Sequence, residues 1–120
     1  MPEIEEFIDE TGRVPFAIWF HSLERTAAAA VAVALLKLRR GLTGGLKSVG
    51  TGVFECKVSM GPGYRIYFGY DGPMLVILLG GGDKSSQQRD ITLATKLWAN
   101  YRDRKSVADQ SNALKRPPSF

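Results

Sequence analysis

The chain has 120 residues, which is the length of one domain and too short for two independent hydrophobic cores. With 44% hydrophobic and 23% charged residues, it is composed like a folded globular protein, which excludes a disordered one. The net charge is +4, and five of the twelve acidic residues lie in the first ten positions, so the rest of the chain is much more basic. A basic body favours a polyanionic partner, although solubility alone would also account for the charge.

The sequence has no sign of membrane insertion or secretion. The longest apolar run covers residues 27–36, whereas a membrane-spanning helix needs about 20 apolar residues. The start, "MPEIEEFIDE", is acidic and no apolar region follows it, unlike in a secretory signal. The single cysteine, Cys56, excludes an internal disulfide and a zinc site built from several cysteines. We therefore expect a cytoplasmic protein without a membrane partner.

The N-terminal third predicts one strand and two helices. The residues "EIEEFID" have the spacing of a short strand, and "DETGR" after them is rich in turn residues. Pro15 suits the first turn of a helix, and the apolar residues that follow recur at helical spacing. Residues 25–40 are alanine-rich with a basic last turn, and Gly41 would end this second helix. We expect the two helices to form an antiparallel hairpin.

The remainder predicts a three-stranded meander and a last helix. "TGGLKSVGTG" has the composition of an irregular connector, while "VFECKVSM", "GYRIYFGY" and "PMLVILLG" predict antiparallel strands joined by tight turns. The third strand is apolar on both faces, as in a central strand covered on two sides. Helical spacing then extends from Gln87 to about Arg104. We expect an α+β domain over residues 1–104, followed by a polar, irregular tail over residues 105–120.

Alternation along the strands predicts a polar patch on the sheet. Glu55 and Lys57 share one face of the first meander strand, and Arg65 and Tyr67 share the corresponding face of the second. Antiparallel pairing would bring these two pairs together, next to the loop that carries Lys84. The result would be one acid, two cations and a phenol on the open side of an otherwise apolar sheet.

The stretch "LGGGDKSS" is similar to a phosphate-binding loop but lacks its defining residues. The motif G-x-x-x-x-G-K-[ST] needs glycines at the positions that Leu78 and Asp83 occupy here, and an aspartate would repel a phosphate. This disfavours a nucleotide-hydrolysing enzyme. We expect the glycines to turn the chain sharply into the last helix, with Asp83, Ser85 or Ser86 as its cap.

A longer segment resembles a known family. "GVFECKVSMGPGYRIYFGYDGPMLVILLGGGDKSSQQRDI", preceded by "RVPFAIWFHSL" and "GLKSVG", is similar to the RelE/ParE superfamily toxins of type II toxin–antitoxin systems. Within that superfamily it resembles the HigB-like branch, often labelled addiction module killer proteins, over about residues 3–104. The resemblance implies a RelE-like α+β fold with an N-terminal strand, a helical hairpin, a curved antiparallel sheet and a C-terminal helix.

The resemblance also implies an activity and partners. It implies a metal-independent mRNA endoribonuclease, or mRNA interferase, which needs no cofactor and inhibits translation and growth by cutting mRNA, free or on the ribosome. A cognate antitoxin, usually a helix-turn-helix protein in this branch, would hold it inactive. Superfamily members cleave RNA by attack of a ribose 2′-OH on the adjacent phosphate, with basic and phenolic side chains in place of a histidine pair.

Position by position, the resemblance assigns catalytic roles to the polar patch. Arg65 and Lys84 match the family pattern, and Arg65 would grip two phosphate oxygens. Lys57 stands where arginine is usual, which keeps the charge but loses the bidentate fork. Glu55 would orient Lys57 or Arg65, or act as a general base if its pKa were raised, and Tyr67 would stack on a base or hold a proton.

Three further residues are candidates for binding RNA: Lys47, Arg89 and Tyr101. Tyr101, on the last helix, is also the rival of Tyr67 for the role of catalytic phenol, and the sequence does not decide between them. The single histidine, His21, falls opposite an apolar helical face and is expected at the surface. Cys56 is expected to fill the core.

Two alternatives to the nuclease remain open. The ParE arm of the superfamily shares the fold and inhibits DNA gyrase without cutting RNA, and a degenerate member would only bind nucleic acid. A gyrase inhibitor would not need Lys57, Arg65 and Lys84 to converge on one concave surface. The placement of these three cations therefore distinguishes the hypotheses.

Overall fold

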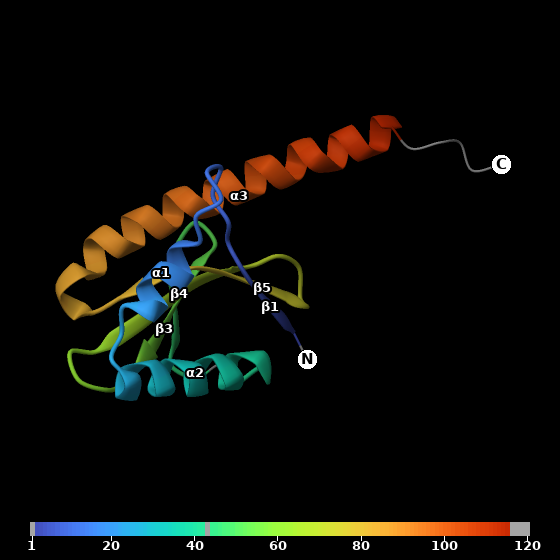
Figure 1. Cartoon of the computed structure of the whole chain (residues 1–120). Helices are drawn as coiled ribbons and strands as arrows, with labels where there is room; N and C mark the ends of the chain where they lie inside the picture. Colours follow the sequence, from blue (N-terminus) through green and yellow to red (C-terminus); the bar gives the residue numbers. More distant parts are fainter. Residues whose placement is uncertain (1, 43, 116–120) are drawn as a thin grey trace.

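The computed structural model describes residues 2–42 and 44–115, with the backbone alone over 109–115. The chain forms a mixed five-stranded sheet and three α-helices in this part (Figure 1). The elements are β1 (Glu3–Glu6), α1 (Pro15–His21), α2 (Arg25–Arg39), β2 (Leu46–Gly50), β3 (Val53–Val58), β4 (Tyr64–Tyr70), β5 (Leu75–Gly82), the 3-10 helix η1 (Lys84–Ser86) and α3 (Gln87–Lys115). The expectation of an α+β fold is confirmed.

The sheet has the order β1-β5-β4-β3-β2. β2 to β5 pair antiparallel with their neighbours along the chain, which confirms the predicted meander. β1 adds to the other side of β5 in parallel, with Glu3 opposite Leu75. A parallel pair needs a long crossover connection, and here the chain between the two strands holds both N-terminal helices and three strands.

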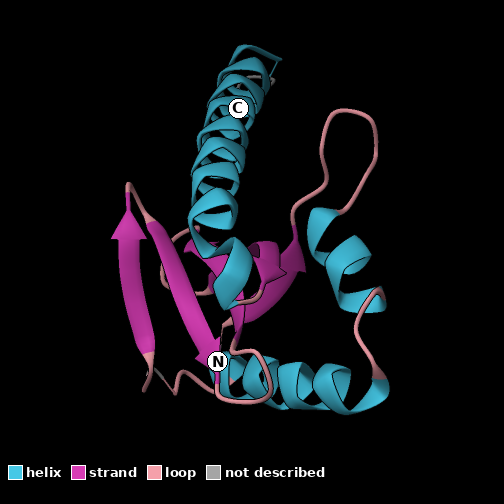
Figure 2. Ribbon diagram, turned by 90° about the vertical axis from the view of Figure 1, so that its left-hand side faces the viewer, coloured by secondary structure: helices cyan, strands magenta, loops and turns pink. Residues whose placement is uncertain are grey.

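The sheet separates two hydrophobic cores. α1 and α2 cover one face and α3 crosses the other, so the molecule has three layers (Figures 1 and 2). In β5, the four residues 76–79 are buried and alternate between the two cores. This confirms that the apolar run "MLVILL" belongs to a central strand covered on both sides.

The predicted antiparallel hairpin of helices is wrong. α1 and α2 lie at a wide angle to each other rather than side by side (Figure 2). Only residues 22–24 link them, and each helix packs on the sheet through its own apolar residues: Phe16 from α1, and Val31 and Leu38 from α2, reach the same core. Burial against the sheet therefore decides where each helix lies.

The connector "TGGLKSVGTG" contains a strand that sequence analysis missed. β2 pairs with β3 from Leu46 to Gly50, and Thr51 and Gly52 form the two-residue turn between them. Both turn residues have positive φ, 46° and 88°, as a type I′ hairpin turn requires. The dipeptide Thr51-Gly52 was therefore the available signal, hidden within a glycine-rich composition.

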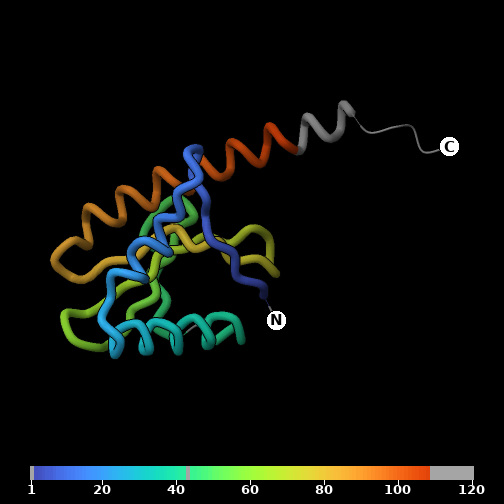
Figure 3. Tube along the Cα trace, in the orientation of Figure 1, coloured from blue at the N-terminus to red at the C-terminus, as the bar shows by residue number. Residues whose placement is uncertain are grey.

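The last helix is longer than predicted. α3 continues to Lys115 instead of ending near Arg104. The prediction of an irregular tail is therefore wrong for residues 105–115. Residues 116–120 lie outside the described part. The N-terminal loop runs beside this helix (Figure 3), where Arg104 donates a hydrogen bond to the carbonyl of Ile8 at 2.7 Å and covers the ring of Phe7. In the described residues, no helix is long and apolar enough to cross a membrane.

Candidate functional site

A groove of about 430 Å³ opens where β3 ends and β4 begins. It lies between the turn that joins these strands and the start of η1. Its lining residues are Lys57, Ser59, Met60, Gly61, Pro62, Gly63, Arg65 and Lys84. Three cations predicted from sequence therefore line one concave surface, which is the arrangement that the nuclease hypothesis requires.

Strand register brings two of these cations together. Lys57 and Arg65 are directly paired residues of β3 and β4, so their side chains leave the sheet on the same face. Lys84, the first residue of η1, lines the same groove. Its backbone N–H donates a hydrogen bond of 3.4 Å to the carbonyl of Pro62. Lys57 and Lys84 are exposed, and an exposed ammonium group can meet a ligand without moving.

The turn before β4 is shaped to leave room for Arg65. Gly63 has a φ of +79°, and a Cβ at this position would lie 3.3 Å from Nη1 of Arg65. Nη1 donates a hydrogen bond to the Gly63 carbonyl at 2.6 Å. Glycine therefore supplies both the backbone conformation and the close approach of the guanidinium.

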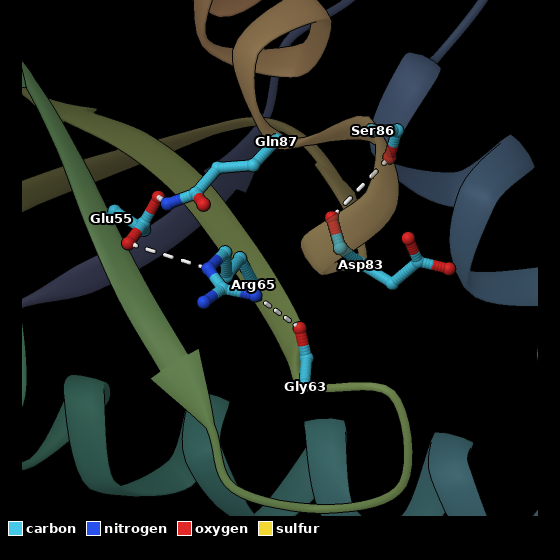
Figure 4. Close-up of polar contacts among 6 residues, drawn as sticks. All are labelled: Glu55, Gly63, Arg65, Asp83, Ser86 and Gln87. Carbon is cyan, nitrogen blue, oxygen red and sulfur yellow. Dashed lines mark hydrogen bonds and ion pairs between the residues drawn. The ribbon is translucent and has the colours of Figure 1, made fainter.

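Arg65 is largely buried although it lines the groove. Only 6% of the residue is exposed, and Oε1 of Glu55 lies 3.6 Å from its Nε (Figure 4). The other oxygen of Glu55, Oε2, accepts a hydrogen bond of 2.9 Å from Nε2 of Gln87. A buried charge is costly unless paired, so Glu55 both neutralises and orients the guanidinium.

Of the two roles considered for Glu55, the geometry favours orientation. Glu55 is 5% exposed and lies behind Arg65, and it is absent from the lining of the groove. Each of its carboxylate oxygens already has a partner, Arg65 or Gln87. A general base must reach the hydroxyl proton that it removes, and a buried carboxylate with both oxygens partnered is poorly placed for that.

Tyr67 does not lie on an open surface, and the predicted open side of the sheet is wrong. The residue is 0% exposed, because α3 covers this face and packs Ala94 and Trp98 into the same core. Its hydroxyl makes no hydrogen bond. Burial raises the pKa of the Tyr67 phenol, and the nearby Glu55 carboxylate raises it further. Tyr67 therefore cannot stack on an RNA base in this conformation, and its phenol stays protonated.

Tyr101, the rival phenol, is also remote from the groove. Its hydroxyl donates to Oδ2 of Asp71 at 2.5 Å, and its ring stacks on Trp98 with 5.2 Å between centroids. Asp71 follows the C-terminal end of β4, whereas Arg65 lies near the start of that strand. Tyr101 thus anchors α3 on the sheet, and neither tyrosine lines the groove.

The two remaining RNA-binding candidates are exposed cations outside the groove. Lys47 lies on β2 opposite Glu55, so it is on the same face of the sheet as Arg65 but nearer the edge. Arg89 lies in the first turn of α3. Both could extend a positively charged path, but neither lines the groove itself.

The glycines of "LGGGDKSS" do not form the predicted sharp turn. Gly80, Gly81 and Gly82 are the last residues of β5 and pair with β4. None of the three has a positive φ. Two of them allow close packing: a Cβ on Gly81 would lie 2.3 Å from the ring of Trp19, and one on Gly82 would lie 1.8 Å from Oδ2 of Asp90, whereas a Cβ on Gly80 would meet no atom within 4 Å.

Asp83 is the cap at the start of the helical segment, as predicted among the alternatives. Oδ1 of Asp83 accepts two hydrogen bonds from Ser85, one from its backbone N–H at 2.9 Å and one from its hydroxyl at 2.5 Å. These bonds hold the pKa of the Asp83 carboxyl below its usual range. The segment begins as a single 3-10 turn, η1, which places Lys84 at the groove before α3 starts.

Two expectations about residues outside the site are confirmed. His21 is exposed at the end of α1. Cys56 is buried in the core under α2, and burial raises the pKa of its thiol, which makes it a poor nucleophile. Within residues 2–42 and 44–115, no three histidine, cysteine or acidic side chains gather as metal ligands would.

Gln87 is the functional-site residue that sequence analysis missed. It lies far from Glu55 in the sequence, and nothing in "KSSQQRD" distinguishes it from its neighbour Gln88. The contact arises because α3 begins directly over β3 and β4. Only the position of the helix on the sheet reveals it.

Comparison with known proteins shows a relative of this chain but assigns it no function. No family model matches the chain. An uncharacterized protein of Haemophilus influenzae is 43% identical over 83 residues, a match that covers 68% of this chain and 84% of that protein.

Proposed function

We propose that this chain, which belongs to the same family as the Haemophilus influenzae protein, is a metal-independent mRNA endoribonuclease and the toxin of a type II toxin–antitoxin system. The observation that carries the proposal is the groove lined by Lys57, Arg65 and Lys84. Three cations on one concave surface suit a phosphodiester backbone.

The proposal places the chain in the RelE/ParE superfamily and its HigB-like branch. The antiparallel meander and the C-terminal helix on one face of the sheet support the superfamily, whereas the two N-terminal helices do not form the hairpin that the resemblance implies. The remaining parts of the proposal are a cytoplasmic location, a cognate antitoxin of the helix-turn-helix class, and mRNA, free or on the ribosome, as substrate.

In the proposed reaction the 2′ oxygen of a ribose attacks the adjacent phosphorus. A bond forms between these atoms, and the bond from phosphorus to the 5′ oxygen of the next nucleotide breaks. The 2′ hydroxyl gives its proton to water in the open groove, and the leaving 5′ oxygen takes one from a lysine ammonium group of the groove. The products are a 2′,3′-cyclic phosphate and a 5′-hydroxyl end.

The residues of the groove supply charge stabilisation for this step. Negative charge grows on the phosphate in the transition state, and the Gly63 carbonyl and Glu55 hold the Arg65 guanidinium at the groove, where it can stabilise that charge. Lys57 and Lys84 face the same volume and position the neighbouring phosphates. An exposed ammonium group can also donate the proton that the leaving oxygen takes up.

Mapping of 5′-hydroxyl ends on cellular RNA after induced expression tests the proposal. We expect specific cuts in mRNA from the natural chain, strongly reduced cutting with Arg65→Ala, and weaker cutting with Lys57→Ala or Lys84→Ala. Lys96→Ala is the matched control, because it removes an exposed lysine of α3 that lies outside the groove.

Two results would contradict the nuclease. Intact mRNA together with stalled replication would indicate a gyrase inhibitor. Intact mRNA with retained binding of RNA would indicate a member that has lost catalysis. Each variant should be checked for folding by thermal unfolding, since Arg65 is buried and its loss leaves Glu55 without its charge partner.

A further inference from the structure

We propose that Gln87 is a positioning residue of the groove, acting on Arg65 through Glu55. The inference rests on the proposed function, since it concerns how the site is held ready for the reaction. It begins from one contact: Nε2 of Gln87 donates to Oε2 of Glu55 at 2.9 Å (Figure 4). Gln87 is the first residue of α3 and does not line the groove.

The contact matters because each oxygen of Glu55 has a different partner. Oε2 accepts from Gln87, and Oε1 faces Nε of Arg65 at 3.6 Å. Rotation about the last bond of a glutamate side chain costs little energy, so a carboxylate is not oriented by its own covalent structure. The amide of Gln87 fixes that rotation and thereby fixes the oxygen that faces Arg65.

Arg65 depends on this orientation because few groups hold it. Its Nη1 donates a hydrogen bond to the Gly63 carbonyl, but its Nε is buried without a hydrogen bond, and the carboxylate of Glu55 lies 3.6 Å from it. If the carboxylate rotates, the guanidinium loses its fixed counter-charge on one side. A group that stabilises a transition state must be held in place beforehand, and a displacement of about 1 Å can cost up to about 100-fold in rate.

Two substitutions separate positioning from general support of the fold. Gln87→Met keeps the approximate size of the side chain and removes the donor. Gln87→Glu places a second carboxyl against Glu55, so one of the two has a raised pKa and its protonated form can again donate a hydrogen bond. Gln88→Met is the matched control, since Gln88 is exposed on the next position of the helix.

The surrounding charges shape the pH response of Gln87→Glu. Arg65 on β4 lies beside Glu55, and the buried phenol of Tyr67 lies on the same strand face. Lys47 on β2 occupies the position paired with Glu55, and Asp90 lies one turn further along α3. These groups set the pH at which the relative rate of Gln87→Glu changes, while the direction of the change follows from the added carboxyl.

The experiment measures kcat and KM across pH on an RNA that the natural chain cuts. We expect Gln87→Met to lower kcat roughly 10-fold at unchanged KM and independently of pH, because Lys57 and Lys84 still bind the strand. The rate of Gln87→Glu relative to the natural chain should rise as pH falls. Gln88→Met should match the natural chain. A normal kcat in Gln87→Met, or a flat pH ratio in Gln87→Glu, would overturn the inference.

A second measurement does not depend on cleavage. In NMR spectra the Nε–H proton of Arg65, assigned through Arg65→Lys, should exchange slowly with water in the natural chain and in Gln88→Met, and several-fold faster in Gln87→Met. Equal exchange in all three would refute the positioning role. If the natural chain cuts no RNA, the proposed function fails, and this exchange measurement alone decides whether Gln87 holds Arg65.

Discussion

Oδ2 of Asp90 lies so close to the backbone of Gly82 that a Cβ on this glycine would be 1.8 Å from it. Asp90 also accepts a hydrogen bond from the hydroxyl of Ser86 at 2.5 Å. The last residue of β5, the end of η1 and the first turn of α3 therefore meet at one point. The position of α3 on the sheet therefore depends on the absence of a side chain at Gly82. So does the position of Gln87, which α3 places against Glu55.

We expect Gly82→Ala to lower the free energy of unfolding by about 1–3 kcal/mol, because Asp90 must move and loses its bond to Ser86. Chemical denaturation measures this. Gly80→Ala is the control, since a Cβ there meets no atom within 4 Å. Adding Asp90→Ala to Gly82→Ala should recover part of the loss; strictly additive effects would show that the two residues do not clash.

Gly81→Ala should be more damaging than Gly82→Ala. A Cβ on Gly81 would lie 2.3 Å from the ring of Trp19, and an indole cannot give way as the end of an aspartate side chain can. The expected loss is about 3 kcal/mol or more, with a changed tryptophan fluorescence spectrum because α1 is displaced from the sheet. An unchanged spectrum and stability would mean that α1 does not pack here.

Asp71 should make stability depend on pH. Its carboxylate accepts hydrogen bonds from Lys105 and Tyr101. These bonds hold the pKa of Asp71 below its usual range, and the bond from Lys105 has the larger effect. Because the pKa of Asp71 is lower in the folded than in the unfolded chain, where it is about 3.9, its ionised carboxylate stabilises the fold at pH values above about 3.9. This stabilisation is lost as the pH falls through the pKa of Asp71 in the folded chain. Asp71→Asn should therefore cost on the order of 1 kcal/mol at neutral pH.

The difference between natural chain and Asp71→Asn should shrink toward zero as the pH is lowered below about 4. Unfolding in urea at a series of pH values measures it. Asp103→Asn, at an exposed position of α3, serves as the control and should show no such convergence. A difference in the free energy of unfolding that stays constant down to the lowest pH measured would mean that the Asp71 carboxylate does not stabilise the packing of α3.

Tyr67→Phe should leave both folding and RNA cleavage intact. The hydroxyl is buried without a hydrogen bond, so its removal should change stability by less than about 1 kcal/mol or stabilise the protein slightly. Cleavage should persist because the side chain does not reach the groove. A large loss of activity in a well-folded Tyr67→Phe would restore the catalytic role inferred from sequence.

The salt dependence of RNA binding should show how many cations of the groove contact phosphates. With a non-cleavable 2′-deoxy strand, the slope of log affinity against log salt should fall by about 0.7 for each contacting lysine removed, in Lys57→Ala and in Lys84→Ala. Fluorescence anisotropy provides the measurement. Lys96→Ala should keep the natural slope, and a uniform slope across all three variants would place the strand elsewhere.

The strand faces of the candidate site could be predicted from sequence because alternation along a strand is a local property. Alternation predicts Glu55 and Lys57 on one face of β3, and the register confirms that they pair with Tyr67 and Arg65 of β4. The same reasoning could not tell which face α3 covers. Burial of Tyr67 under that helix is a tertiary fact without a local signature.

The errors elsewhere have a similar cause. The strand β2 is an edge strand with few apolar residues, so composition concealed it, and only its partner β3 stabilises it. The angle between α1 and α2 depends on where each packs against the sheet. The glycines of "LGGGDKSS" were explained by turn chemistry, whereas close approach to Trp19 and Asp90 requires them.

The parallel pairing of β1 with β5 sets the order of events during translation. β1 leaves the ribosome first, and its partner at Leu75 is made 72 residues later, as the register from Glu3 shows. At about 5–20 residues per second, the strand waits roughly 4–14 s without a partner. Glu3, Glu5 and Glu6 carry charge on a strand that would otherwise be free to pair with another chain. These charges disfavour such pairing during that interval, and also in the folded protein, where β1 remains at the edge of the sheet.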